Sequence, residues 1–439
     1  MKYYSTNHTA PEATLAEAVM RGLAPDRGLY MPERIDKLPE KFFERIQGMS
    51  FQDTAFEVAK RFFGEDIAEE DLRTIVFDTL AFDCPLVHVG DNIWALELFH
   101  GPTLAFKDVG ARFMARMLAY FLKKDRLDDK PGSSRINVLV ATSGDTGSAV
   151  ANGFLGVDGI HVYVLYPRGK VSLIQESQFA TLGRNITALE VDGTFDDCQA
   201  LVKEAFADDE LNKRVRLTSA NSINVARLLP QAFYYFNAYA SMKELGKADD
   251  LVVCVPSGNF GNITAGLFAK RMGLPVKRFI AANNANNVFY EYLKTGTYTP
   301  RQSIRTIANA MDVGDPSNFA RILDLYQGSH AGITADINGA TYTDEQIREA
   351  MTECYRQCNY ILDPHGACGW RALKEGLHPE ETGVFLETAH PAKFKDTVEQ
   401  AIGNPVIIPA RLAEYMKGKK LSQPISKQFD DFKQLLLDA

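Results

Sequence analysis

The chain has 439 residues, a formal net charge of −8, and an ordinary balance of 46% hydrophobic and 24% charged residues. This length can bury a large core in more than one domain. The acidic balance, without any run of Lys or Arg, argues against a nucleic-acid partner. No apolar stretch approaches the roughly 20 residues that cross a membrane. The N-terminus lacks the apolar core of a secretory signal, so we expect a cytoplasmic protein.

Residues 1–90 carry no glycine-loop motif and predict a mostly helical N-terminal region. Beyond them, short apolar strands alternate with helical patterns. The predicted strands cover 136–140, 161–165, 186–191, 251–255, 278–282 and 384–387. The predicted helices cover 108–124, 195–207, 224–245, 263–272 and 391–402. This alternation is typical of an α/β fold with mostly parallel sheets and helices on both faces.

Two segments suggest where the chain passes between α/β domains. The charged stretch 123–134 ends in Pro-Gly-Ser-Ser, and the polar stretch 218–222 precedes a long helical pattern. We therefore predict an N-terminal region, 1–90, and a smaller α/β domain, 131–222. The larger α/β domain is predicted from 91–130 together with 223–439.

Lys107 follows an apolar run and a turn, and a helical pattern starts directly behind it. Apolar Phe106 precedes it and favours a buried setting. Burial disfavours the ammonium form and makes the amine a usable nucleophile near neutral pH. By itself this pattern is typical of an ordinary lysine at a helix start, but two further segments favour a lysine that forms a Schiff base.

The first further segment, 138–151, is a buried-type strand followed by a polar glycine loop and a helix of small residues. Its hydroxyl and carboxylate side chains belong to Thr142, Ser143, Asp145, Thr146 and Ser148. Donors above a helix N-terminus suit the carboxylate of an amino-acid substrate. The same residues could simply cap the helix.

The second, 251–262, is a continuous apolar run that ends in a glycine loop before another helix. Free amides and the helix dipole at such a junction favour a phosphate. A plain strand-to-helix turn has the same pattern. The spacing fits neither a Walker loop nor the dinucleotide fingerprint.

Six cysteines in this length do not make a disulfide framework. Four potential metal ligands lie close together, namely Cys354, Cys358, His365 and Cys368. Cys354 and Cys358 share one face of the helical pattern 344–360, Cys368 lies beside a second pattern at 369–375, and standard zinc spacings are absent. We therefore expect buried structural thiols and no metal site.

The chain resembles the threonine synthase family in its long-chain form, within the pyridoxal-phosphate enzymes of fold type II. The segments that carry the resemblance are 22–30, 96–108, 141–149, 166–170, 219–224, 256–261 and 388–394. They occur in order and span nearly the whole length. The resemblance implies two α/β domains with mostly parallel sheets, the larger one binding the cofactor, plus the N-terminal region.

It also implies the cofactor residues. Lys107 would carry pyridoxal 5'-phosphate, and Thr388 would meet the pyridine nitrogen with a neutral hydroxyl. The cofactor phosphate would lie on Ser257, Gly258, Asn259, Phe260, Gly261 and Asn262. Asp145 stands where the wider family often has an Asn that bonds the cofactor's 3-hydroxyl, whereas Asp is usual in long-chain threonine synthases.

The implied reaction converts O-phospho-L-homoserine and water to L-threonine and phosphate, the last step of threonine biosynthesis, in a carbon-oxygen lyase. Lys107 would move protons at the α and β carbons. Substrate contacts would come from Thr142, Ser143 and Thr146, and the substrate phosphate would bind Asn221, Ser222 and Arg227. An N-cap followed by a first-turn arginine would show the same pattern. However, the helix dipole disfavours a cation there, which favours the anion site.

Three other functions fit parts of this pattern. A phospholyase would release phosphate from the same substrate and give a keto acid. A threonine dehydratase would lack the phosphate motif at 221–227, and a non-catalytic relative would have no need of Lys107. The sequence leaves the oligomeric state open.

Overall fold

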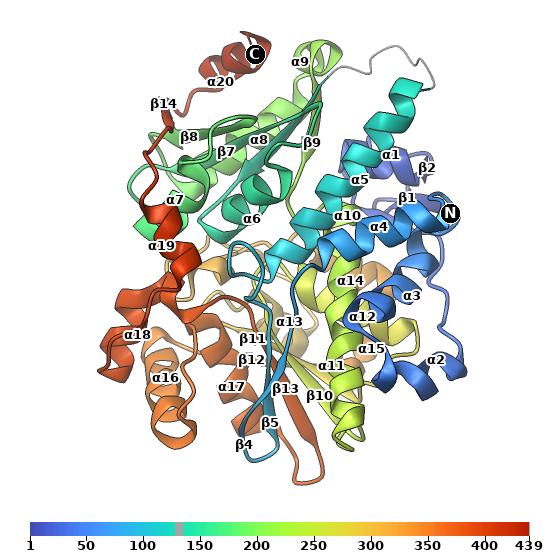
Figure 1. Cartoon of the computed structure of the whole chain (residues 1–439), viewed down its shortest axis with the longest axis vertical. Helices are drawn as coiled ribbons and strands as arrows, with labels where there is room; N and C mark the ends of the chain where they lie inside the picture. Colours follow the sequence, from blue (N-terminus) through green and yellow to red (C-terminus); the bar gives the residue numbers. More distant parts are fainter. Residues whose placement is uncertain (128–134, 439) are drawn as a thin grey trace. The chain divides into compact units, whose positions relative to one another are not determined.

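The computed structural model describes residues 1–127 and 135–438 (Figure 1). The chain forms two compact units, each assembled from separated stretches. Unit 1 contains Met1, Met31–Phe106 and Leu228–Ile407, and unit 2 contains Lys2–Tyr30, Lys107–Arg227 and Ile408–Ala439. The two units group residues by their contacts within the chain and do not test the three predicted domain ranges, which stay a prediction. Of the predicted crossing at 123–134, residues 128–134 lie outside the described residues.

Unit 1 is built on a sheet with the strand order β12-β11-β10-β13-β5-β4. Its strands are β4 (Leu86–Gly90), β5 (Ile93–Glu97), β10 (Leu251–Pro256), β11 (Arg278–Asn283), β12 (Ile337–Thr341) and β13 (Thr382–Glu387). Neighbours pair in parallel except β4, which is antiparallel to β5. Every residue of β10 and β13 is buried, as expected for parallel strands covered on both faces.

Helices of unit 1 cover this sheet, and α17 packs on β10, β11 and β13. The α-helices are α2 (Glu40–Arg45), α3 (Phe51–Phe63), α4 (Glu69–Thr79), α11 (Ala232–Glu244), α12 (Gly261–Arg271), α13 (Val288–Thr295), α14 (Phe319–Leu325), α15 (His330–Asp336), α16 (Asp344–Cys358), α17 (Pro364–Gly376) and α18 (Lys395–Ile402). The 3-10 helices are η1 (Ile46–Gly48), η2 (Leu229–Gln231), η3 (Asn309–Met311) and η4 (Pro391–Phe394). Strand β3 (Tyr30–Pro32) spans the boundary between the two units in the chain.

Unit 2 contains a sheet with the order β14-β8-β7-β6-β9, in which all neighbours are parallel. Its strands are β6 (Ile136–Ala141), β7 (Ile160–Pro167), β8 (Ile186–Val191), β9 (Arg216–Ser219) and β14 (Gln423–Ile425), beside the antiparallel pair β1 (Lys2–Ser5) and β2 (Ala13–Thr14). Its helices are α1 (Leu15–Arg21), α5 (Lys107–Leu127), α6 (Asp145–Phe154), α7 (Leu173–Ala180), α8 (Phe195–Ala207), α9 (Asp209–Arg214), α19 (Ala410–Met416) and α20 (Phe429–Asp438). The short helix α10 (Val225–Leu228) ends at the boundary between the units.

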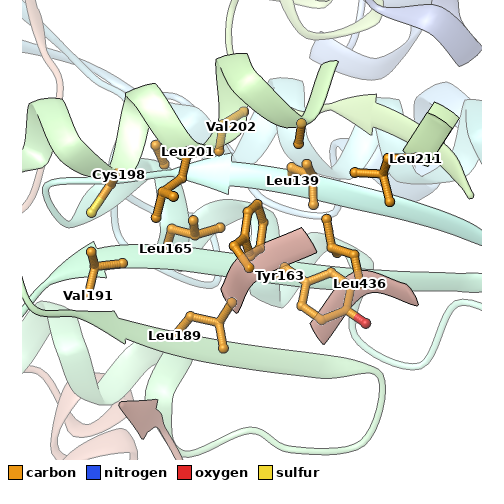
Figure 2. Close-up of a cluster of buried hydrophobic side chains, with 13 residues drawn as sticks. Leu139, Tyr163, Leu165, Leu189, Val191, Cys198, Leu201, Val202, Leu211 and Leu436 are labelled. Carbon is orange, nitrogen blue, oxygen red and sulfur yellow. The ribbon is translucent and has the colours of Figure 1, made fainter. Parts of the chain in front are cut away.

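The core of unit 2 lies between the sheet and helices α8 and α20. Figure 2 shows leucines and valines of β6, β7 and β8 directed at the buried face of α8. Phe432 and Leu436 of α20 complete the cluster, so the C-terminal residues help to bury strands formed far earlier in the chain.

All the predicted strands are present, and most of the predicted helices are too. The single helix predicted over 224–245 is wrong. It is divided into α10, η2 and α11, because Pro230 lacks the amide that a continuous helix needs. The helix predicted over 391–402 begins as η4 for a similar reason, with Pro391 at its first position.

The cysteine stretch also differs in one detail. Cys368 lies inside α17 rather than beside it, and it is buried. Cys354 is buried as well, whereas Cys358 is half-buried. In the part of the chain that the structure describes, no helix is long and apolar enough to cross a membrane.

Replacing Leu165 by Ala tests the core of unit 2. Leu165 is fully buried in this cluster, so Leu165→Ala should lower the free energy of unfolding by about 2–5 kcal/mol through lost burial and a cavity. Leu173→Ala is the matched control, because that leucine is 69% exposed and its loss should cost no more than about 0.5 kcal/mol. Denaturant unfolding of both variants measures the difference, and equal effects would contradict this core.

Candidate active site

The segment that leads to Lys107 is fixed to the chain that follows β13. The amide of Leu98 donates to the Glu387 carbonyl at 3.0 Å, and the amide of Phe106 donates to the Thr388 carbonyl at 2.9 Å. Ala105 and Ala389 form an antiparallel bridge, beyond which the amide of His390 donates to the Leu104 carbonyl at 3.0 Å. Phe106 directly precedes Lys107, so the backbone before the lysine is held at the end of β13.

Lys107 is the first residue of α5 and is half-buried, as is Phe106. Its setting is therefore more open than the apolar neighbour predicted. Leu104, three residues earlier, has a positive φ of 58°, which a non-glycine residue adopts only in a tight turn held by its surroundings. This turn directs the chain into α5.

Thr388 comes directly after β13, and its side chain is largely buried, at 7% exposure. Among the described residues, none bonds its hydroxyl, which leaves that group open to a ligand. The Nδ1 of His390 accepts from the amide of Ala392 at 3.1 Å, capping η4. His390 is thus a half-buried capping histidine.

The glycine loop after β10 presents unbonded amides at the start of α12. The amides of Gly258, Phe260, Gly261 and Asn262 donate to no acceptor in the part of the chain that the structure describes. The amide of Ser257 is different, because it donates to the Ala282 carbonyl at 2.8 Å. An anion would therefore bind the later amides, where the helix dipole also contributes.

Two backbone features shape this loop. Phe260 adopts a left-handed conformation with φ 61°, and its carbonyl accepts from Thr264. Gly258 lies against another backbone segment, since a Cβ there would be 2.6 Å from Cα of Met311 and 2.9 Å from the carbonyl oxygen of Ala310. Gly258 is therefore required by the segment behind the loop.

Asn262 contributes a buried donor to the same loop. Its Oδ1 accepts from the hydroxyls of Tyr234 and Tyr235, each at 2.7 Å. Its Nδ2 is buried and has no partner among the described residues. A buried donor left in this state costs free energy unless a ligand accepts from it.

A fully buried arginine stands behind the loop. Arg321 donates through Nη1 to Oδ1 of Asn318 at 2.8 Å, and Nδ2 of Asn318 donates to the Asn259 carbonyl at 3.0 Å. Burial lowers the pKa of Arg321 to about 9, so its guanidinium stays positive at neutral pH. The cation adds positive potential to the anion-binding loop.

In unit 2, the loop from β6 to α6 contains both a capping hydroxyl and unbonded hydroxyls. The hydroxyl of Thr142 accepts from the amides of Gly144 and Gly147 at 2.9 and 2.8 Å, so Thr142 is a structural cap. The hydroxyls of Ser143 and Thr146 have no bonded partner in the described ranges and are half-buried. These two hydroxyls remain available to a substrate, whereas that of Thr142 is already used.

Asp145 is buried at the first position of α6. Its Oδ1 accepts from Nε2 of Gln175 at 2.9 Å. Gly144 before it has φ 149°, a conformation that favours glycine. Gln175 therefore fixes one oxygen of the carboxylate. No sequence pattern predicts this partner, because α7 meets α6 only in the folded unit.

Arg227 is 4% exposed and lies against α5. Its Nη1 donates to the Ala220 carbonyl, and its backbone carbonyl lies where a Cβ on Gly110 would clash, at 2.6 Å. Burial lowers the pKa of Arg227 to about 10, and the nearby carboxylate of Asp108 opposes that shift. The helix dipole gives only weak support for an anion site at Arg227, because α10 is only four residues long.

The other residues of this phosphate motif lie on the same turn. Asn221 is half-buried, and its Nδ2 donates weakly to the Ala141 carbonyl at 3.4 Å. Ser222 is half-buried beside it. The structure thus gathers the three predicted phosphate residues within one short segment of unit 2.

Comparison with known protein families defines the class. Residues 74–388 match the family described as pyridoxal-phosphate dependent enzyme. Maize serine racemase shares the fold, with a TM-score of 0.53 and 16% identity over 73% of this chain and 92% of the racemase. The chain is therefore a pyridoxal-phosphate enzyme with the fold-type II architecture.

Two narrower family models match its ends. Residues 2–80 match the threonine synthase N terminus, and 366–435 match the threonine synthase C-terminal region. Threonine synthase of Escherichia coli strain K12 is 42% identical, and that of Haemophilus influenzae is 41% identical, each over 100% of both chains. The chain belongs to the threonine synthase family.

Solved structures agree. The crystal structure of threonine synthase from Escherichia coli gives a TM-score of 0.91 at 42% identity over 100% of both chains. Threonine synthase from Brucella melitensis with bound pyridoxal phosphate gives 0.91 at 34% identity, covering 100% of this chain and 99% of that one.

The residues of unit 1 fit this cofactor. Open amides at an α12 N-terminus, a buried unpartnered Asn262 Nδ2 and a cation behind the loop suit a phosphate. The open hydroxyl of Thr388 suits a ring nitrogen. Lys107 follows Phe106, whose amide donates to the Thr388 carbonyl, and carries the kind of amine that pyridoxal-phosphate enzymes require.

Replacing Gly258 by Ala tests the loop. The new Cβ would meet the backbone of Met311 at 2.6 Å, so Gly258→Ala should displace the loop and weaken pyridoxal-phosphate binding roughly tenfold or more, which corresponds to about 1.4 kcal/mol. Gly376→Ala is the control, because its Cβ would make only an ordinary contact of 3.6 Å with Ile280. Equilibrium titration of each apoprotein with the cofactor measures the effect, and equal affinities would remove the loop from the site.

Proposed function

We propose that this enzyme converts O-phospho-L-homoserine and water to L-threonine and phosphate, the last step of threonine biosynthesis. The observation that carries the proposal is the full-length match to threonine synthases, which includes the models specific to both ends of that family. The buried Arg227 in unit 2, which no cofactor role requires, supports a phosphorylated substrate.

Bound pyridoxal phosphate supplies an electron sink that stabilises negative charge developing on the substrate carbons. Lys107 would hold it, and the amine of this lysine would be the proton carrier of the site. That amine takes the α-proton and returns protons at the β carbon, as a general base and acid. Its position at the start of α5, after a turn fixed at Leu104, holds it in one place.

Other side chains orient the two partners. The hydroxyls of Ser143 and Thr146 and the N-terminal end of α6 bind the substrate carboxylate. Asn221, Ser222 and Arg227 bind its phosphate, for which a fixed guanidinium is well suited. Thr142 holds the loop rather than the substrate, in agreement with its two bonds to amides.

The ring would be held by Thr388 and Asp145. A neutral hydroxyl at Thr388 would leave the pyridine nitrogen without a proton, and the electron sink would then be weaker than with a carboxylate partner. Asp145 lies at the 3-hydroxyl end in this assignment, and Gln175 keeps its carboxylate in one orientation. The cofactor phosphate binds the amides from Gly258 to Asn262.

A cytoplasmic location belongs to the same proposal. All six cysteines are free thiols, as is usual in a reducing compartment. The alternative function, a phospholyase that releases a keto acid, uses the same substrate and differs only in whether water adds at the β carbon.

Incubating the purified enzyme with O-phospho-L-homoserine should yield threonine and phosphate in equal amounts. A keto acid in place of threonine would establish the phospholyase instead.

Lys107→Ala should lose the visible absorption of the bound cofactor and the fixation of the cofactor by borohydride. Its turnover should fall by more than the roughly 10² to 10⁴ typical of one general base. Lys123→Ala, an exposed lysine on the same helix, should change none of these, and full turnover in Lys107→Ala would defeat the assignment.

Arg227→Ala should leave the cofactor spectrum intact and weaken substrate binding by about 2–5 kcal/mol, the usual cost of removing one partner of a buried charge pair. Inorganic phosphate should inhibit the parent competitively and the variant far less. Arg214→Ala, an exposed arginine of unit 2, is the control. Because Arg227 also donates to the Ala220 carbonyl, thermal unfolding of the variant is recorded as well. Loss of cofactor with unchanged substrate affinity would give the arginine another role.

A further inference from the structure

Two buried glutamates lie at the two ends of the central strand β13, and the charges around them have opposite sign. Glu381 precedes the strand and is bonded through both oxygens to Arg278, with Lys277 nearby. These partners lower the pKa of Glu381 to about 2. Glu387 ends the strand, is fully buried, and is paired with no Lys or Arg in the described part of the chain.

The groups that face Glu387 are mostly acidic. They are Asp363 at the N-cap of α17, Glu97 on β5, Tyr360 in the loop between α16 and α17, and Cys354 on α16. Burial raises the pKa of Glu387 well above its usual value, and the charge of Asp363 adds to this. Burial likewise raises the pKa values of Tyr360 and Cys354, so both stay neutral.

The hydrogen bonds of His365 decide the charge on Asp363. The amide of Ala310 donates to Nε2 of His365 at 3.1 Å, so Nε2 carries no proton. Nδ1 must then carry it, and it donates to Oδ1 of Asp363. The imidazole is therefore neutral. Asp363 also accepts from the amides of His365 and Gly366 as the cap of α17, which suits an ionised carboxylate.

Glu387 has one oxygen satisfied and one not. Its Oε1 accepts from the amide of Asp363 at 2.7 Å. No N–H or O–H of the described residues reaches Oε2. This oxygen lies against Gly366, whose amide donates to Oδ2 of Asp363 at 3.3 Å, so the Asp363 carboxylate is the neighbouring acceptor. Two carboxyl oxygens attract only when a proton lies between them.

We propose that Glu387 is a protonated acid whose O–H donates to Asp363, and that the network of Glu387, Asp363 and His365 positions both ends of the cofactor cradle in unit 1. At one end, Glu387 directly precedes Thr388. At the other, His365 holds Ala310, whose neighbour Met311 backs Gly258 of the phosphate loop. One proton-dependent network thus reaches the ring end and the phosphate end.

Close packing supports this assignment. A Cβ on Gly366 would lie 1.5 Å from Oε2 of Glu387. The first turn of α17 can therefore approach the carboxyl only because residue 366 is glycine. The approach brings the cap carboxylate of Asp363 to the Glu387 acid.

The test compares glutamine substitutions at the two ends of β13. In Glu387→Gln, the amide oxygen can accept from the Asp363 amide and the NH₂ group can donate to the Asp363 carboxylate. This variant should therefore retain cofactor on dialysis as the parent does, whereas Glu387→Ala should lose it at least tenfold faster. Glu381→Gln removes an ionised partner of Arg278 and should lower the unfolding temperature without altering cofactor retention.

The stability of the parent relative to each glutamine variant should change with pH in opposite directions for the two glutamates. A group with a raised folded pKa stabilises fully only below its unfolded pKa, about 4.3 for Glu. The parent should therefore lose stability relative to Glu387→Gln as pH rises above about 4.3. Glu381 has a lowered pKa, so the parent should keep its advantage over Glu381→Gln at every pH above about 4.3, and lose it only as pH falls towards about 2.

Infrared difference spectra of parent minus Glu387→Gln should show the carbonyl band of a protonated carboxylic acid at neutral pH. Absence of that band, or destabilisation by Glu387→Gln as large as by Glu381→Gln, would overturn the protonated acid. Unchanged cofactor retention in Glu387→Ala would overturn the link to the cradle. That link rests on the proposed function, whereas the spectra and unfolding curves are obtained on the full chain with or without cofactor, so the two failures are distinguishable.

Discussion

Strands β10 and β13 are buried along their entire length, and this constraint decides where chemistry can occur in unit 1. A charged or strongly polar group along either strand would lose its water without a partner. Polar groups therefore collect where the strands end. The end of β10 becomes the glycine loop, and the end of β13 becomes Glu387 and Thr388. Because neighbouring parallel strands end at the same edge, the open amides and the open hydroxyl lie at one edge of one sheet.

The two ends of that edge have opposite electrostatic character. Behind the glycine loop lie a buried guanidinium and the positive end of α12, which favour a dianion. Behind Thr388 lie carboxyl groups, and the α17 N-terminus stabilises the charge that remains on Asp363. An elongated ligand with a phosphate at one end and a neutral ring at the other matches this polarity in only one orientation.

The strands and the glycine loops could be predicted from the sequence, because continuous apolar runs ending in glycine have few other structures open to them. Pro230 could have indicated the division of the helix, but the long apolar pattern around it predicts one continuous helix. The partners of the loops could not be predicted. Gln175, Asn318 and Glu387 meet Asp145, Asn259 and Asp363 through packing of distant segments, and no local spacing encodes such contacts. Thr142 differs, because its bonds to Gly144 and Gly147 are local, and capping was one of the two roles that the sequence left open.

The order in which the chain contributes to the two units has a consequence for its synthesis. Unit 2 takes its first strand from the N-terminus, yet β14 and α20, which pair with β8 and cover α8, come from the final residues. Domains usually fold as they leave the ribosome, the N-terminal one first. Here the parallel sheet formed by 136–219 must wait, with part of its apolar face uncovered, until Phe432 and Leu436 have been made. Unit 1 has all its segments by residue 407. Unit 2 is thus the last to close, and the uncovered apolar face of its sheet is the kind of surface that favours aggregation during synthesis.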